Sequence, residues 1–238
     1  MTNKASLAAA AIVAAAGLAW APLAQANTIS VGMQQAGVNG GAITTVATGA
    51  SLASFTGSYG TFSANIVSGA QDPSVTFPDL LFSNALDTSS STAGTLMVWI
   101  TGQDLMEPTG AANLNSSFTA NLVPSGWTVT EKTFYDAGNG LFTTVTPAGS
   151  ATFTGISTQT ASDFINFATP FSITHEYIIA ATGAGTTNDT IDTSVPEPGS
   201  LALLGTALLG FGMIGWSRRR RDAQHPTAGT GVSPTSAA

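Results

Sequence analysis

Cysteine is absent from this chain of 238 residues, and charged side chains are scarce. Without cysteine the protein has no disulfide framework and no thiolate chemistry, so its fold must depend on core packing and strand pairing. Charged residues make up 8% of the sequence, against about 25% in ordinary soluble domains. Glycine, serine, threonine, alanine and asparagine take their place, which is typical of exported proteins rich in β-structure.

Basic residues are almost missing from the middle of the chain. Between residues 27 and 194 the only one is Lys132, against eleven aspartates and glutamates. Nucleic-acid binding requires a basic face, so that function is excluded. An anionic polysaccharide would also be repelled unless a divalent cation bridged the two surfaces.

The first 26 residues have the pattern of a secretory signal peptide. Lys4 forms a short positive region, Leu7 to Ala19 an apolar region, and Ala24-Gln25-Ala26 a cleavage motif in which Ala24 and Ala26 are the small residues. The alternative is an uncleaved N-terminal membrane anchor. The alanine-rich run is only moderately apolar, which favours cleavage, and the mature chain is then expected to begin at Asn27.

A second targeting pattern lies between Val195 and Arg221. Leu201 to Trp216 carries no charge, and a helix counted from Gly199 would be roughly 27 Å long. That length barely spans a hydrocarbon core of about 30 Å. Four arginines follow (Arg218, Arg219, Arg220 and Arg221), which the positive-inside rule keeps in the cytoplasm. A buried core helix is the alternative, and the arginines argue against it.

The order of Pro196, Glu197 and Pro198, then one apolar helix, then an arginine cluster, closely resembles the PEP-CTERM sorting signal. The resemblance covers about 27 of the 238 residues. It implies that an exosortase, a membrane-embedded enzyme of Gram-negative bacteria that make exopolysaccharide, cleaves near Pro196-Glu197-Pro198. The upstream domain would then leave the inner membrane for the cell surface or the extracellular matrix. Family members usually end soon after the arginines, whereas this chain continues to Ala238.

These patterns divide the chain into four parts. Residues 1–26 are the signal peptide, 27–194 the exported domain, 195–221 the sorting signal, and 222–238 a small-residue, polar tail that we expect to be disordered in the cytoplasm. A cleaved leader followed by a stop-transfer helix places the exported domain outside and the arginines inside.

The exported domain has the pattern of an antiparallel β-sandwich. No window has the 3.6-residue apolar period of a helix. Short runs of β-branched and aromatic residues alternate with Gly, Pro, Asn and Ser, which predicts about eight to ten short strands. The expected strands cover 28–33, 42–48, 51–56, 59–67, 79–87, 95–101, 117–123, 127–135, 141–145, 151–156, 171–181 and 186–193.

Particular segments carry further expectations. Thr95 to Thr101 is apolar on both faces, so it is expected at the centre of a sheet. The weaker segments Asp79–Asp87 and Thr186–Thr193 are expected at edges. A change of parity between Trp127 and Phe134 indicates a β-bulge. Asp136 to Gly140 is a turn, with Leu141 to Val145 as its return strand.

Few residues suggest catalysis, and we predict neither a metal nor a cofactor. His175 is the only histidine between residues 27 and 194, and on an apolar strand face it is expected to be a hydrogen-bonded core residue rather than a base or metal ligand. No Gly-x-Ser-x-Gly elbow occurs. Glu131 and Glu176 lie within strands and could form a glycosidase pair, but solvent-facing charges are the simpler expectation. The Asp136 turn lacks the further acids of a calcium loop.

Three functions fit these observations. The leading hypothesis is a non-enzymatic surface or exopolysaccharide-matrix protein with a structural or adhesive role. The second is a carbohydrate-binding module, which needs at least two of Trp127, Tyr135 and Tyr59 exposed and coplanar on one face. The third is a secreted hydrolase, which needs a cleft where His175 or a pair of carboxylates converges.

Overall fold

The computed structural model describes residues 27–71 and 80–196, which form an antiparallel β-sandwich. The predicted all-β fold class is confirmed, with twelve strands rather than about eight to ten. The signal peptide (1–26), the helix and arginines of the sorting signal, and the tail lie outside the described residues. Within those residues, no helix is long and apolar enough to cross a membrane.

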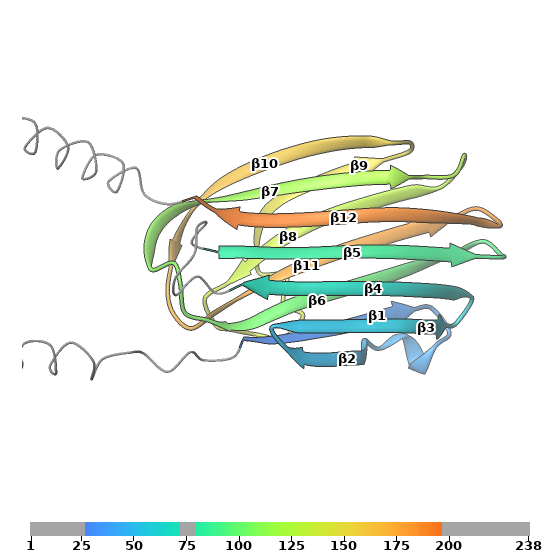
Figure 1. Cartoon of the computed structure of the whole chain (residues 1–238). Helices are drawn as coiled ribbons and strands as arrows, with labels where there is room; N and C mark the ends of the chain where they lie inside the picture. Colours follow the sequence, from blue (N-terminus) through green and yellow to red (C-terminus); the bar gives the residue numbers. More distant parts are fainter. Residues whose placement is uncertain (1–26, 72–79, 197–238) are drawn as a thin grey trace, which may run out of the picture. The chain divides into compact units, whose positions relative to one another are not determined.

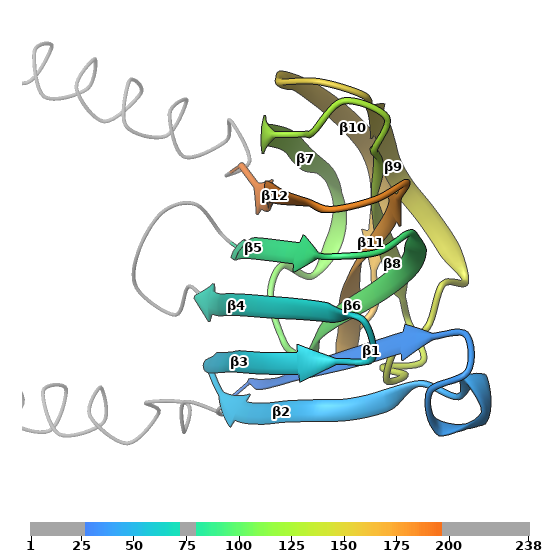
Figure 2. The ribbon, with the colours of Figure 1, turned by 90° about the vertical axis from the view of Figure 1, so that its right-hand side faces the viewer.

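The strands form two six-stranded sheets, which we call A and B (Figures 1 and 2). Sheet A has the order β2-β1-β6-β11-β8-β9 and sheet B the order β10-β7-β12-β5-β4-β3. The strand bounds of sheet A are β1 Thr28–Gln35, β2 Thr44–Ala50, β6 Gly94–Leu105, β8 Thr128–Asp136, β9 Thr146–Phe153 and β11 Phe171–Ala181. Those of sheet B are β3 Leu52–Tyr59, β4 Phe62–Gln71, β5 Leu80–Ser90, β7 Gly110–Leu122, β10 Ser157–Phe167 and β12 Gly185–Val195.

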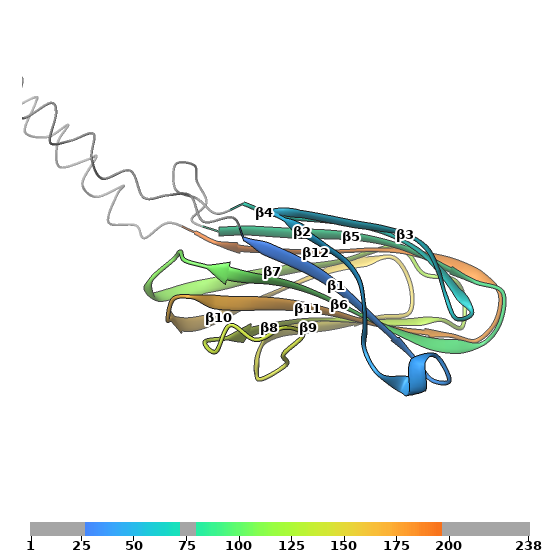
Figure 3. The ribbon, with the colours of Figure 1, turned by 90° about the horizontal axis from the view of Figure 1, so that it is seen from below.

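The chain crosses repeatedly between the two sheets. Only the β1–β2, β3–β4–β5 and β8–β9 connections join strands that are neighbours in one sheet. Every other connection passes from one sheet to the other, so the sheets are tied together along their length. The strands run along one common long axis (Figure 3).

Alternation along the strands fills the space between the sheets. On β4, for example, Phe62, Ala64 and Ile66 are buried while Ser63 and Asn65 are exposed. Burying each large apolar side chain contributes about 1.5–3 kcal/mol, and strand periodicity places them all on one side. The core is therefore the single layer between the two inner faces.

β6 confirms the expectation of a central, doubly buried strand. It pairs with β1 on one side and β11 on the other. Val98 and Ile100 face sheet B, while Trp99 and Thr101 lie on the outer face and are still buried. The chain between β8 and β9 covers part of that outer face, since the Phe142 amide donates to Thr101 Oγ1 at 3.1 Å.

The covering loop overturns the expected return strand at Leu141–Val145. Asn139 and Phe142 have φ values of 55° and 53°, which break the extended backbone, and the return strand β9 begins at Thr146. The Asn139 side chain accepts from the Asp104 amide at 2.9 Å and donates to Asp104 Oδ1 at 2.8 Å. These bonds hold the loop against β6 instead of letting it pair as a strand.

Two strands expected at edges are central. β5 lies between β12 and β4, and β12 lies between β7 and β5. Both sequences looked weak because inward positions are polar, such as Asn84 and Thr88 on β5 and Asp189 on β12. The expected bulge exists next to Thr133 and Phe134, but Ala148 of β9 is the extra residue.

Candidate functional site

The outer face of sheet B carries an array of polar side chains on five of its strands and part of the sixth, and we call it the polar face. It is built almost entirely from hydroxyl and amide side chains, with two carboxylates. Its polar members are Ser54, Thr56 and Ser58 on β3; Ser63 and Asn65 on β4; Ser83, Asp87 and Ser89 on β5; Asn113, Asn115, Ser117, Thr119 and Asn121 on β7; Thr158, Thr160, Ser162 and Asn166 on β10; and Thr186, Asn188, Thr190, Asp192 and Ser194 on β12.

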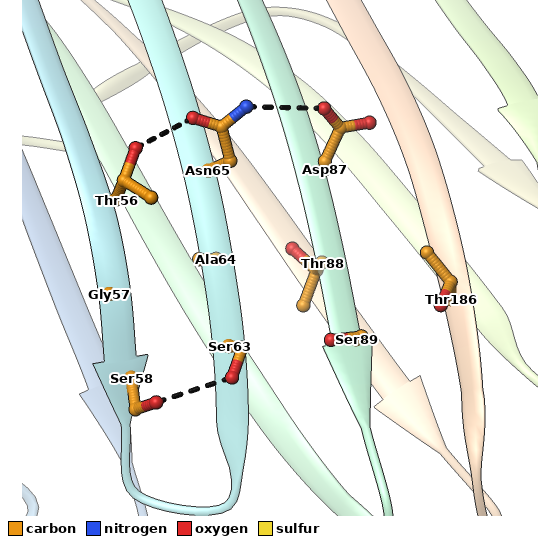
Figure 4. A pocket seen from close by; sticks show the side chains of 10 residues that line it. All are labelled: Thr56, Gly57, Ser58, Ser63, Ala64, Asn65, Asp87, Thr88, Ser89 and Thr186. Carbon is orange, nitrogen blue, oxygen red and sulfur yellow. Dashed lines mark hydrogen bonds between the residues drawn. The ribbon is translucent and has the colours of Figure 1, made fainter.

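One part of the polar face is a hydrogen-bonded ladder across β3, β4, β5 and β12, and Figure 4 shows its bonds on the first three of these strands. Thr56 donates to Asn65 Oδ1 at 2.8 Å, and Asn65 donates to Asp87 Oδ2 at 3.4 Å. Asn188 donates to the other oxygen of Asp87. A shallow hollow of about 370 Å³ lies over these strands, with Ser58, Ser63 and Ser89 among its lining residues. Since the ladder groups bond one another, few of them are free for a ligand.

A second hollow, which we call the β10 hollow, lies over β10, β7 and β12 and has a volume of about 600 Å³. Its lining residues are Asn115, Ser116, Ser117, Thr160, Ala161, Ser162, Asp192 and Ser194. Among the side chains that the structure describes, Asp192 accepts a hydrogen bond from Ser83, and Ser116 contacts Thr193. No such bond joins Asn115, Ser117 or Thr160 to a described side chain, so their donors and acceptors face the hollow.

Phe164 is the one aromatic side chain exposed on the polar face. It is 70% exposed and lies two residues beyond Ser162 on the same face of β10. Its register partner is Asn113 on β7, two residues before Asn115 and on the same face. An exposed ring therefore lies one same-face position beyond the residues that line the β10 hollow, where it could pack on the apolar face of a ring-shaped ligand.

The aromatic residues expected to form a sugar platform do not form one. Trp127, Tyr135 and Tyr59 are all buried. Trp127 packs edge-on against Phe62 at 6.5 Å between ring centroids, and Tyr135 packs against Phe167 and Phe171. Strand parity points Tyr59 and Tyr135 between the sheets, so the carbohydrate-binding hypothesis is wrong in the form based on these three rings.

His175 is a core residue, as expected. It is fully buried, packs on Phe82 at 4.6 Å between ring centroids, and its Nε2 lies 2.7 Å from Thr193 Oγ1. Its Nδ1 bonds the Asn84 amide. Burial lowers the pKa of His175 to about 3, so the ring stays neutral. It is a structural link between the sheets and has no access to a substrate.

Glu131 and Glu176 lie on adjacent strands but on opposite faces of sheet A. Glu131 pairs in register with Tyr177, one residue from Glu176, and points into the core, where it is fully buried. Glu176 points outward and binds Lys132 at 2.9 Å. Two carboxylates on opposite faces of one sheet cannot flank a glycosidic bond. The simpler expectation of solvent-facing charges is also wrong, because Glu176 is only 5% exposed.

Other predicted site residues lie at or beyond the end of the described chain. Pro196 is exposed and comes directly after β12. Glu197, Pro198, the four arginines Arg218 to Arg221, and Ala24 and Ala26 lie outside the described residues. Across 27–71 and 80–196, no three histidine, aspartate or glutamate side chains gather closely enough to hold a metal ion. At Asp136 the carboxylate accepts from the Gly138 and Gly140 amides, which makes a closed turn.

The polar face was not predicted from the sequence, although the sequence contains a signal for it. β7 places Asn113, Asn115, Ser117, Thr119 and Asn121 at every second position. A strand whose outward positions are all amide or hydroxyl groups predicts a hydrogen-bonding surface. Only the sheet order shows that β10 and β12 present the same chemistry beside it.

No family model matches this chain, and no curated protein does. Among solved structures, the xylan-binding module CBM22-1 of Paenibacillus barcinonensis Xyn10C is similar over 61% of this chain and 94% of its own, with 10% identity and a TM-score of 0.32. TmCBM61, solved with β-1,4-galactotriose, matches over 59% and 92%, with 9% identity and a TM-score of 0.31.

The enzymatically active domain of tailspike protein 4 from bacteriophage CBA120 has the same TM-score of 0.31, at 12% identity. That match covers 56% of this chain and only 19% of the tailspike chain. At such scores none of these likenesses carries a ligand or an activity over to this protein.

Proposed function

We propose that this protein is an exported, non-enzymatic β-sandwich of the cell surface or exopolysaccharide matrix, and that its polar face binds neutral polysaccharide. The observation that carries the proposal is the β10 hollow, where free amide and hydroxyl groups stand beside an exposed ring. Sugar sites in proteins combine a few convergent polar groups with apolar contact area. Asn115, Asp192 and Phe164 together provide both kinds of contact.

The ligand is proposed to be neutral because the exported part of the chain repels negative charge. Lys132 is its only basic residue, and its amine is paired with Glu176 on the outer face of sheet A, away from the polar face of sheet B. Asp87 and Asp192 add negative charge to the polar face itself. Carboxylates accept hydrogen bonds from sugar hydroxyls, whereas a uronate or sulfate group would meet like charge.

Binding is tested with the purified chain and immobilised polysaccharides. Phe164→Ala is expected to weaken binding to a neutral glucan, xylan or galactan about fivefold, the equivalent of roughly 1 kcal/mol of lost stacking. Asn115→Ala, which removes a hydrogen-bonding group from the hollow, is expected to weaken it to a similar degree. Val145→Ala is the matched control, because Val145 is 71% exposed in the β8–β9 loop, away from the polar face.

Either of two results would overturn the binding proposal. One is unchanged affinity in both Phe164→Ala and Asn115→Ala. The other is tighter binding to an anionic uronate polymer than to every neutral polysaccharide in the absence of divalent cations.

Export and processing form the second half of the proposal. The leader ending at Ala26 and the resemblance of Pro196-Glu197-Pro198, the apolar run and the arginines to a PEP-CTERM signal support it. The exosortase would act at the inner membrane, which holds the precursor transiently. Because β12 ends at Val195, the ordered strands finish one residue before the motif begins.

Intact-mass measurement tests the processing. In a host with an exosortase, the mature species is expected to run from Asn27 to near Pro196. Deletion of the exosortase is expected to leave a membrane-bound species that keeps the arginines. The same long species in both hosts would contradict processing while leaving the binding proposal intact.

No catalytic role is proposed. His175 is sequestered in the core, and Glu131 and Glu176 face opposite sides of sheet A. The groups that suggested a hydrolase therefore do not converge on a cleft. A structural or adhesive contribution to the matrix follows if many copies bind polysaccharide in this way.

A further inference from the structure

Two carboxyl side chains meet the core from opposite sheets. Glu131 points inward from β8 of sheet A, and Asp189 points inward from β12 of sheet B. Both are fully buried. Acidic side chains are rarely buried unless they are paired, so the two need a physical explanation.

No cation neutralises this pair in the part of the chain that the structure describes. Lys132 follows Glu131 in sequence but points to the other face of sheet A, where it binds Glu176. His175 is neutral and uses both ring nitrogens, on Asn84 and Thr193. Two separate charges in this core would therefore repel each other without compensation.

Hydrogen bonds do not compensate either. Both Glu131 oxygens and Asp189 Oδ1 have no hydrogen-bond partner in the described structure. Asp189 Oδ2 accepts from Thr187 Oγ1 at 2.8 Å, which is the one side-chain bond to the pair. Burying a charged carboxylate with both oxygens unpaired costs a large desolvation free energy. Burying the protonated, neutral carboxyl costs much less, so the core favours the protonated form.

The other titratable groups around the pair also favour protonation. Tyr177, beside Glu131 on β11, bonds the Asn84 carbonyl and the Ile191 amide and stays neutral. Asp192 and Asp87 lie on the outward faces of β12 and β5 and add negative charge nearby. Burial, followed by the charge of Asp189, raises the pKa of Glu131 to about 9, and the Thr119 backbone amide opposes the rise. Burial raises the pKa of Asp189 to about 7, with the Thr187 bond opposing it.

We infer that Glu131 and Asp189 hold a proton between the two sheets at neutral pH, and that the folded state is destabilised when alkaline conditions remove it. The two buried carboxyls make the stability of the core depend on protonation, and they do not form a binding site. Its chemistry needs only a proton, which is present in any aqueous compartment. This inference does not depend on the proposed polysaccharide binding.

The direction of the pH effect follows from where the proton binds. In the unfolded chain both carboxyls lose their protons at ordinary values near 4 to 4.5, whereas in the folded chain Asp189 does so at about 7 and Glu131 at about 9. The unfolded state therefore binds fewer protons across this window, so stability falls as pH rises. Between pH 7 and 9 the unfolding constant is expected to rise up to about tenfold per pH unit.

The window from pH 7 to 9 isolates the pair from the other buried groups. His175 is neutral in the folded state, with a pKa of about 3, and in the unfolded state, with a pKa of about 6.5, it is about three-quarters neutral at pH 7 and almost fully neutral at pH 8 and above. Tyr177 is protonated in both states, because burial raises its pKa well above 10. Glu131, and Asp189 near pH 7, therefore account for most of the change in protonation on unfolding in this range.

Denaturant unfolding of the full chain in mild detergent, at pH 7, 8 and 9, tests the inference. Glu131→Gln cannot ionise, so its unfolding constant is expected to change by less than about twofold where the wild type changes up to about tenfold per unit. Glu176→Gln is the matched control, because it is the same change on the outer face of the neighbouring strand. It is expected to keep the wild-type dependence.

Other results would overturn the inference. One is an equal pH dependence in Glu131→Gln and the wild type. Another is a stoichiometric divalent cation in the purified chain whose chelation lowers stability, which would mean that the carboxyls hold a metal. If Glu131→Gln fails to fold, infrared titration of the wild type decides: the C=O stretch of a protonated carboxyl must be present at pH 7 and weaken by pH 9. Its absence at pH 7 contradicts the proposal.

Discussion

At the scale of single residues, the two-residue period of a strand decides what each side chain can do. Glu131, Lys132 and Thr133 follow one another on β8, yet Lys132 alone lies on the outer face, where its amine meets Glu176. His175 and Glu176 are separated in the same way on β11. Chemical residue types therefore say little about function until the face is known.

His175 gives a prediction at this scale. His175→Ala removes both bonds, to Asn84 and Thr193, and leaves a gap beside Phe82. A destabilisation of roughly 2–4 kcal/mol is expected from the unpaired buried groups and the lost packing. Denaturant unfolding at pH 7 measures it, with His225→Ala as the control. A His175→Ala variant as stable as the wild type would show that the ring does not link the sheets.

At the scale of the elements, the β8–β9 connection acts as a cover for the outer face of sheet A. Asn139 fixes it to Asp104 by two side-chain bonds, and the Ser172 hydroxyl donates to the Gly140 carbonyl at 2.9 Å. Phe142 lies over Gly32, where an added Cβ would come within 2.7 Å of its ring. The cover explains why Thr101 is buried on an outward face.

Asn139 is the residue to test in this element. Asn139→Ala removes both bonds to Asp104 and places alanine at a φ of 55°, so a loss of about 1–3 kcal/mol and faster proteolysis in the loop are expected. Asn139→Gly separates the two causes, because glycine accepts this backbone angle. It should recover part of the stability. Equal loop proteolysis in Asn139→Ala and the wild type would contradict the assigned role.

The same elements show how far sequence reasoning reaches. β6 was placed correctly because apolar residues on both of its faces leave only a central position. β5 and β12 were predicted at edges because Asn84, Thr88 and Asp189 make their inward faces look polar. The sequence of a single strand does not show which residues of the opposite sheet will contact these polar side chains. β10 was missed altogether, because Ser157 to Asp163 has only Ala161 as an apolar residue. The hydrophobic pattern thus predicts the class of fold but not the order of its polar strands.

The candidate site depended even more on strand order. The β10 hollow joins residues of β7, β10 and β12, which are separated by as many as 79 positions, from Asn115 to Ser194. Register places them side by side, and register depends on pairings across the whole domain. The targeting segments needed no such information, because their patterns are local.

At the scale of the whole molecule, charge separates the ligands that the polar face could accept. Binding to a neutral polysaccharide is expected to change little between low and high salt, because no ion pair forms. Binding to a uronate polymer is expected only when calcium bridges the two acidic surfaces. Affinity measured across a salt series, with and without calcium, checks both. Strong salt-sensitive binding to the uronate polymer without calcium would contradict this account.

The position of β12 has a mechanical consequence. This strand continues directly into Pro196, and it is paired with β5 from Gly185 to Val195 and with β7 from Asn188 to Ser194. A pull on the chain beyond Pro196 therefore acts along a strand held on both sides, so the hydrogen bonds bear the load in shear and must break together. An edge strand in the same place would peel away one bond at a time. If the protein is tethered through its C-terminal segment, the pulling force is applied to a strand that is hydrogen-bonded on both sides.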